Sequence, residues 1–257
     1  MNKKVAILVI SCDKYGDLWE TCAKTFNYFW PDCKYEKFIM SNHEKCNQPG
    51  FNSILVGDDL SWSHGLKSAL TQLETDYDYV FTMVEDYFFI ESIDNNYIES
   101  MFNEFVNLEG NFLSLYKLPS KLSFVNKFFG ELENNIPYRQ SIGFTLWNIH
   151  TLQAVLDPAE NAWEFEKNGV LRGFRYDKFY GSYLNYKVLN LVIKGKIVPS
   201  SYNVLIKLFP DLEFSRASLS KKEWRDMVIK DFFILQFLFY VPSFIKKWIY
   251  FNWKKPV

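Results

Sequence analysis

The sequence predicts an α/β fold in which a mostly parallel central sheet is flanked by helices and followed by a C-terminal amphipathic helical appendage. The first 90 residues alternate between strand and helix patterns, as expected of strands joined by crossover helices. The 257 residues, 48% of them apolar, are enough to bury one large core. From Lys221 onward the chain becomes basic and aromatic, which sets the appendage apart.

The first 92 residues predict a β-α-β-α-β succession. Residues 5–11 form a continuous run rich in β-branched side chains, typical of a strand covered on both faces. A helix is expected from about residue 17 to residue 29, where Trp30-Pro31 ends it. A second helix is expected over residues 63–73, with Ser63 as its cap. The other strands are expected at residues 35–40, 53–56 and 79–84.

The middle of the chain predicts a mixture of shorter elements. Helices are expected at residues 95–107, 151–156 and 163–168. Strands are expected at residues 112–116, at 138–147, which contain Gly143, and at 189–197.

Composition and charge exclude several classes of protein. The net charge of −1 gives no reason to expect nucleic-acid binding. The four cysteines form no C-x-x-C pair, which predicts reduced thiols and no zinc site. The N-terminal apolar run ends at Cys12-Asp13-Lys14 and is interpreted as a first buried strand, not a signal peptide. No stretch reaches the 18 apolar residues of a membrane span, so none is expected.

Polar side chains follow several of the predicted parallel strands. Ligands of such sheets bind beyond the carboxyl ends of the strands. The residues expected at this edge are Asp13, Asn42, Asp58, Asp59, Glu85 and Asp86.

Glu85-Asp86-Tyr87 is the strongest local signal. Two adjacent carboxylates that end a buried strand are unfavourable unless a cation or hydrogen-bond donors meet them. A Mg²⁺ or Mn²⁺ ion held there would neutralise the charge of a diphosphate leaving group. The alternative is a pair of loop acids that cap the next segment.

The order of these motifs resembles a known family. A strand followed by Cys12-Asp13, then Trp62-Ser63-x-Gly65 opening a helix, then an acidic pair ending the fourth strand is similar to the nucleotide-binding half of GT-A glycosyltransferases. Residues 141–147, 160–166 and 192–196 resemble segments of bacterial capsule, lipopolysaccharide and exopolysaccharide glycosyltransferases. The resemblance covers about residues 4–200.

The resemblance implies a GT-A-like, Rossmann-related domain over residues 1–220. Residues 1–92 would be its nucleotide-binding half and residues 93–220 its acceptor half. The implied activity is transfer of a sugar from a nucleotide-sugar donor to a hydroxyl of a growing, lipid-linked bacterial surface glycan. The implied location is the cytoplasmic side of the plasma membrane, at its inner face. The alternative is a non-catalytic carbohydrate- or nucleotide-binding scaffold of a polysaccharide assembly complex.

The resemblance also assigns residues to the nucleotide sugar. Asp13 would face the base or ribose, and Glu85 and Asp86 would lie at the diphosphate. Basic side chains would meet the diphosphate, particularly without a metal; these are Lys194, Lys196 and Arg172. The segment that would line the nucleotide contains Trp62, Ser63, Gly65 and Lys67, of which Lys67 would approach the phosphate. The alternatives are a turn residue for Asp13 and surface charges for the lysines and the arginine.

Metal dependence stays open. GT-A enzymes usually carry Asp-x-Asp at this strand end, with the final Asp as metal ligand. Here Tyr87 stands at that position, which leaves Asp86 as the candidate ligand for Mg²⁺ or Mn²⁺ and keeps metal-independent transfer as the alternative.

Residues 163–166, Trp-Glu-Phe-Glu, supply the candidate general base. An inverting transferase must remove the proton of the acceptor hydroxyl as its oxygen attacks the anomeric carbon. Two residues apart on a helix, Glu164 and Glu166 point about 200° apart, so only one can face the site. The resemblance favours Glu166. The alternative is a solvated turn with Trp163 as a core anchor.

Residues 221–257 are expected to hold the protein on a membrane surface without crossing it. Eight basic residues against three acidic ones give this segment a net charge of +5, and ten of the 22 residues 232–253 are aromatic. Both features favour the headgroup region of an anionic membrane. The alternatives are a helix packed on the domain and an oligomer interface.

Overall fold

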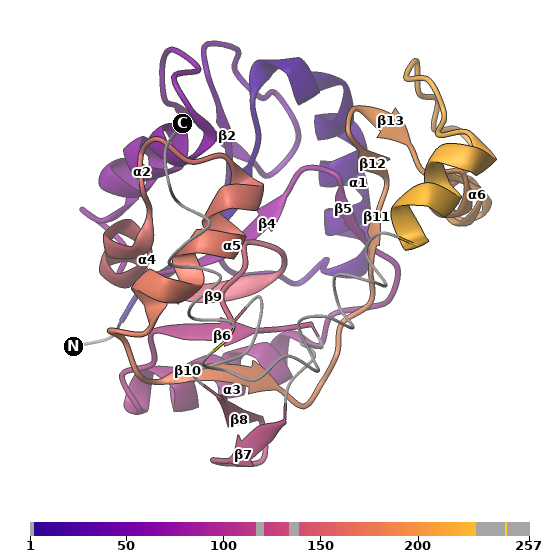
Figure 1. The fold of residues 1–257 in the computed structure, drawn as a ribbon. Helices are drawn as coiled ribbons and strands as arrows, with labels where there is room; N and C mark the ends of the chain where they lie inside the picture. The colour runs from indigo at the N-terminus through magenta and orange to yellow at the C-terminus, as the bar shows by residue number, and fades with distance from the viewer. Residues whose placement is uncertain (1–2, 117–120, 134–138, 230–244, 246–257) are drawn as a thin grey trace. The chain divides into compact units, whose positions relative to one another are not determined.

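The computed structural model describes residues 3–116, 121–133, 139–229 and 245 (Figure 1). The chain divides into two compact units, Met1–Leu189 and Asn190–Val257. The sequence predicts a boundary at residues 220/221 instead, so the predicted acceptor half, residues 93–220, spans both units.

The first unit is built on a mostly parallel sheet, which confirms the predicted α/β class. Among the described residues the sheet has nine strands, seven running in one direction and two, β8 and β9, in the other. In spatial order they are β3 (Asn52–Leu55), β2 (Glu36–Ser41), β1 (Val5–Ile10), β4 (Tyr79–Val84), β9 (Thr145–Asn148), β6 (Phe112–Ser114), β10 (Phe179–Ser182), β8 (Phe129–Leu132) and β7 (Leu122–Phe124). The antiparallel β9 therefore lies between the parallel strands β4 and β6.

Helices cover both faces of this sheet (Figure 1). They are α1 (Trp19–Phe29), α2 (Trp62–Leu73), α3 (Asn95–Asn107), α4 (Ile149–Val155) and α5 (Ala162–Gly173). Helices α2, α4 and α5 contact one another and cover one face, where Leu8 of β1 and Phe165 of α5 belong to one core. On the other face the Phe81 ring of β4 packs on Trp30, which ends α1, and on Phe102 of α3. Because both faces are covered, all six residues of β1 are buried, as its continuous apolar run predicts.

Helix caps explain where two of the helices begin. Ser61 caps α2 by accepting a hydrogen bond from the His64 backbone N–H. The prediction that Ser63 is the cap is wrong, because Ser63 lies inside the first turn of α2 and is buried. Asn161 and Glu164 form a capping box that starts α5 at Ala162. The helix runs on to Gly173, beyond the end of the predicted 163–168.

Two predicted strands differ from those in the structure. Only the last part of 138–147 is a strand, β9, because residues 141–144 form the loop that enters it. The predicted strand 189–197 is interrupted. Its residues belong to β11 (Val188–Asn190), which pairs with β5 (Tyr87–Phe89), and to a hairpin of β12 (Val192–Ile193) and β13 (Lys196–Ile197). In the turn of this hairpin Lys194 and Gly195 have φ of 52° and 75°, as a tight hairpin turn requires.

The second unit contains the β12–β13 hairpin, α6 (Pro199–Leu208) and a helical stretch at residues 221–229. The side chain of Lys196 forms an ion pair with Glu223, at 2.6 Å, which ties the hairpin to this stretch. Trp224, Val228 and Ile229 are exposed on it. Most of the predicted appendage, residues 230–244 and 246–257, lies outside the described residues. Within the described part of the chain, no helix has the length and apolar character needed to span a membrane.

Candidate functional site

The loops after β1, β2 and β3 meet at the carboxyl edge of the sheet and are joined there by Asp13. Its carboxylate accepts hydrogen bonds from the backbone N–H groups of Asn42 (2.9 Å), His43 (3.0 Å) and Glu44 (3.2 Å), which follow β2. The Asn42 side chain continues the connection by donating to the carbonyl of Gly57, after β3 (2.9 Å). Asp13 therefore fixes the geometry of this edge, and its predicted contact with a base or ribose stays a prediction.

Glu85 and Asp86 follow β4 at the same edge. Ile10 and Val84 are register partners, so the residues that follow them, from Ser11 and from Glu85, leave neighbouring strands side by side. Glu85 is buried, and Asp86 and Tyr87 are half-buried. Burial raises the pKa of the Cys12 thiol, and the nearby Glu85 carboxylate adds to this effect. The sheet thus brings Asp13, Glu85 and Asp86 to one edge, as the sequence predicts.

A hydrogen-bonded chain connects Glu166 of α5 with the end of β6. The Tyr116 hydroxyl donates to Ser141 Oγ, and Ser141 Oγ donates to Glu166 Oε1 (2.9 Å). The Gly143 backbone N–H also donates to Ser141 Oγ (3.3 Å). Burial raises the pKa of the Glu166 carboxyl above its ordinary value, while the hydrogen bonds from Ser141 and from the Ile142 backbone oppose this.

Gly143 lets two tyrosines approach the backbone between this chain and the acidic pair. A Cβ atom at Gly143 would lie 3.0 Å from the Tyr116 ring and 3.2 Å from the Tyr87 ring. Tyr87 directly follows Asp86, so the two rings bridge the end of β4 and the Tyr116–Ser141–Glu166 chain. That the acidic pair and Glu166 form one site stays a prediction.

Glu164 has a different environment from Glu166. Its carboxylate accepts a hydrogen bond from the Asn161 backbone N–H (2.9 Å) in the capping box, and its side chain is exposed. Trp163 is 68% exposed and so does not anchor the core. Phe165 is the buried residue of this turn.

The predicted nucleotide-lining residues of α2 mostly serve packing. The Trp62 ring packs on Phe165 with 5.8 Å between ring centroids. Ser63 and Gly65 are buried, and Gly65 faces Val56, after β3. Lys67 is exposed. Their contact with a nucleotide stays a prediction.

The predicted phosphate-binding cations belong to different units of the chain. Arg172 binds the buried Glu160 carboxylate through both terminal nitrogens and also donates to the Val155 carbonyl (2.6 Å), so it supports the fold. Lys194 and Lys196 belong to the second unit, where Lys196 pairs with Glu223. Their role at a diphosphate stays a prediction.

No group of three or more His, Cys, Asp or Glu side chains in the described part of the chain is arranged to hold a metal ion. Mg²⁺ is commonly held by one or two carboxylates together with substrate phosphates. Asp86, with Glu85 beside it, fits that partial ligand set, so Mg²⁺ or Mn²⁺ binding there stays a prediction.

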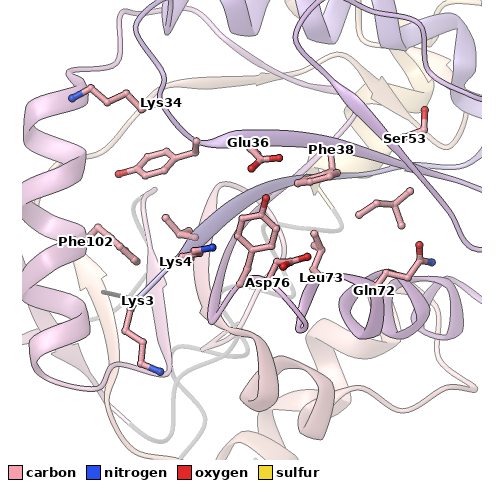
Figure 2. A pocket seen from close by; sticks show the side chains of 14 residues that line it. Lys3, Lys4, Lys34, Glu36, Phe38, Ser53, Gln72, Leu73, Asp76 and Phe102 are labelled. Carbon is pink, nitrogen blue, oxygen red and sulfur yellow. The ribbon is translucent and has the colours of Figure 1, made fainter. Parts of the chain in front are cut away.

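A pocket of about 800 Å³ lies at the opposite edge of the sheet (Figure 2). It is lined by residues at the amino ends of β1 and β2, including Lys4 and Glu36, and by Asp76, which follows α2. It contains none of the predicted site residues. Since ligands of parallel sheets bind at the carboxyl edge, this pocket is not the candidate site.

No protein-family model matches the chain, and no curated protein matches it. Among solved structures, S. aureus TarS matches 82% of this chain and 40% of its own, with 13% identity and a TM-score of 0.47. A second S. aureus TarS structure, in complex with UDP, matches 83% of this chain and 67% of its own, with 12% identity and a TM-score of 0.48. UTP-bound UGPase from Acinetobacter baumannii matches 88% of this chain and 99% of its own, with 8% identity and a TM-score of 0.46. This chain thus spans well under half of the first TarS chain, and TM-scores below 0.5 support no conclusion about function.

Sequence reasoning missed Tyr116 and Ser141 as parts of the site. Ser141 stands at the start of a segment that the resemblance singled out, residues 141–147, but nothing in the spacing links it to Tyr116 or Glu166. The sequence signal that could have pointed to Ser141 is its position as a polar residue directly before an apolar run.

We expect Asp13→Ala to destabilise the first unit by about 1–2 kcal/mol, because three backbone N–H groups would lose a charged acceptor. Chemical denaturation measures the change. Asp58→Ala is the matched control, since the exposed Asp58 carboxylate lies 3.2 Å from His43 Nε2 at the surface, and its loss should change stability by less than about 0.5 kcal/mol. Equal effects of the two substitutions would contradict the role of Asp13 in joining the loops.

Proposed function

We propose that this protein is a glycosyltransferase that moves a sugar from a nucleotide-sugar donor to a hydroxyl of an acceptor. The observation that supports the proposal is a pairing of two kinds of carboxylate at the carboxyl edge of the sheet. Glu85 and Asp86 follow β4. The half-buried Glu166 is joined by hydrogen bonds through Ser141 to Tyr116, whose ring, like that of Tyr87, lies beside Gly143. Sugar transfer from a nucleotide diphosphate needs both functions, charge control at the leaving group and proton removal at the acceptor.

Glu166 is proposed as the general base of an inverting reaction. The acceptor oxygen forms a bond to the anomeric carbon, the bond from that carbon to the diphosphate breaks, and Glu166 takes the acceptor proton. The nucleoside diphosphate leaves with the electron pair of the broken bond. A carboxyl group whose pKa is raised by burial suits this role, because a stronger base accepts the proton more readily near neutral pH.

Asp86 is proposed to act at the diphosphate, with Glu85 beside it. A Mg²⁺ or Mn²⁺ ion bound there would neutralise the negative charge that develops on the leaving group. Because Tyr87 occupies the position of the third carboxylate, basic side chains such as Lys194 and Lys196 are the proposed source of positive charge if transfer is metal-independent.

The finer proposal is an acceptor that is a growing, lipid-linked glycan of the bacterial surface, reached from the cytoplasmic face of the membrane. It rests on the sequence resemblance and on the basic, aromatic residues 221–257. Trp224, Val228 and Ile229 are spaced along one helical stretch and exposed, beside the exposed Lys221, Lys222 and Arg225. Such a surface suits the headgroup region of an anionic bilayer.

We expect Asp86→Asn to lower the transfer rate by two to three decades, equivalent to about 3–4 kcal/mol of transition-state stabilisation. Release of nucleoside diphosphate from UDP-, GDP-, dTDP- and CMP-sugars, with and without Mg²⁺, Mn²⁺ or EDTA, measures the activity. The matched control is Asp32→Asn, an exposed residue after α1. Rates of Asp86→Asn within threefold of wild type would remove Asp86 from the mechanism. Donor binding with no turnover under any condition would instead support the scaffold alternative.

We expect Glu166→Gln to lower kcat about a hundredfold or more and to leave donor affinity unchanged, since the base acts on the acceptor proton. Glu164→Gln is the matched control from the same helical turn, and its expected loss is under threefold. In the wild type the acid limb of kcat should lie above the ordinary Glu pKa of 4.5, because burial raises the pKa of Glu166. The reverse pattern, with Glu164→Gln inactive, would assign the base to Glu164.

We expect a chain ending at Ser220 to lose binding to vesicles of anionic phospholipid while keeping activity on a soluble acceptor. Co-sedimentation with vesicles of phosphatidylglycerol, compared with phosphatidylcholine, measures the binding at low and high salt. The full-length chain should bind the anionic vesicles more tightly, and salt should weaken this binding because it screens the lysines. Unfolding or aggregation of the shortened chain would show that the segment belongs to the core or to an oligomer interface.

A further inference from the structure

The buried Ser141 occupies the centre of the hydrogen-bonded chain at the site. Its hydroxyl accepts from the Tyr116 hydroxyl and from the Gly143 N–H, and donates to Glu166 Oε1 at 2.9 Å. A hydroxyl has one proton to donate and two lone pairs with which to accept, so these three contacts use its full capacity. The proton of Ser141 is therefore directed at Glu166 and not at another partner.

The backbone around Ser141 is fixed from two sides. Its carbonyl accepts hydrogen bonds from Trp147 Nε1 (3.1 Å) and Thr145 Oγ1 (3.3 Å), both on β9. Thr145 Oγ1 in turn lies 2.7 Å from Thr82 Oγ1 on β4. Hydrogen bonds therefore join Ser141 to β9 and, through Thr145, to β4, the strand that the acidic pair follows.

Tyr116 is held as firmly. It follows β6, and its carbonyl accepts a hydrogen bond from Ser114 Oγ (2.8 Å). Burial raises the pKa of Tyr116, and the Glu166 carboxylate and Tyr87 add to this effect, so the phenol keeps its proton and acts as a donor. The Glu166 carboxylate acts electrostatically on Tyr116. Glu166 itself accepts hydrogen bonds from the Ser141 hydroxyl and from the Ile142 backbone N–H.

We propose that Ser141 and Tyr116 are positioning residues that orient Glu166 for proton transfer and set its proton affinity through the directed chain Tyr116 O–H to Ser141 O–H to Glu166 carboxylate. This proposal rests on the proposed function for its catalytic meaning, but the chain itself is a property of the fold. In a buried site a hydroxyl donated to a carboxylate stabilises the ionised form. The Tyr116 donation strengthens the Ser141 donor, because hydrogen bonds in a chain polarise one another.

The sign of the expected change follows from this arrangement. Removing the Ser141 hydroxyl withdraws a donor from the ionised carboxylate, so the pKa of Glu166 rises further. Removing only the Tyr116 hydroxyl weakens the Ser141 donor and should raise the pKa by a smaller amount. The acid limb of the kcat profile should move to higher pH in the same order.

The experiment compares Ser141→Ala, Tyr116→Phe and the wild type, with Ser182→Ala as the matched control. Ser182, which ends β10, is also a buried serine, and its hydroxyl donates to the Phe128 carbonyl, which is not part of the chain. The pKa of Glu166 is read from its side-chain carboxyl ¹³C shift, assigned by its disappearance in Glu166→Gln. We expect a roughly tenfold change in the proton dissociation constant for Ser141→Ala, a smaller change in the same direction for Tyr116→Phe, and none for Ser182→Ala.

Kinetics form the second readout. In Ser141→Ala kcat should fall about tenfold or more at neutral pH with the donor KM unchanged, and its acid limb should follow the shifted pKa. An unchanged Glu166 pKa in a folded Ser141→Ala protein overturns the proposal, as does a shift of the same size in Ser182→Ala. If Ser141→Ala does not fold, Tyr116→Phe decides by the same readings. If the wild type transfers no sugar, the proposed function fails, and the carboxyl titration still decides whether the chain sets the proton affinity of Glu166.

Discussion

The site depends on one feature of the sheet, the antiparallel insertion of β9 between β4 and β6. Because β9 runs against its neighbours, the loop that enters it, residues 141–144, lies at the edge where β4 and β6 end. This places Ser141 and Gly143 beside the residues that leave the two parallel strands, Asp86-Tyr87 and Tyr116. If the strand in this position were parallel to β4 and β6, the loop that enters it would lie at the opposite edge of the sheet.

In energetic terms, the fold stabilises the ionised carboxyl group of Glu166 only in part. Burial of Glu166 favours its neutral form, whereas the donors from Ser141 and Ile142 favour its ionised form. Since burial is the larger influence, the pKa is raised, and Glu166 opposes folding increasingly as the pH rises from the pKa of the unfolded chain towards that of the folded one. A group that lowers stability in this way is a candidate for function, because active sites are where pKa values are shifted by environment.

Periodicity and strand ends predicted the parts of the fold that depend on local sequence. The strand Tyr79–Val84 and the helix Asn95–Asn107 have the predicted bounds, since each has a clear pattern and a clear end. The antiparallel direction of β9 could not be predicted, because it depends on which strands the chain pairs with in space. The contact of Ser141 with Glu166 depends on that direction, so the sequence suggested Glu166 as the base without its partners. The choice of cap, Ser61 over Ser63, depended on which hydroxyl is left outside the packed first turn.

The tyrosine at position 87 follows from the same geometry. A carboxylate there would add a third negative charge next to Glu85 and Asp86 and close to the Tyr116–Ser141–Glu166 chain, and like charges at close range disfavour ionisation of all members. Tyr87 instead packs its ring against Gly143, opposite Tyr116, and adds no charge at neutral pH. An uncharged residue at this position also limits the negative charge near the Tyr116–Ser141–Glu166 chain, where burial already raises the pKa of Glu166.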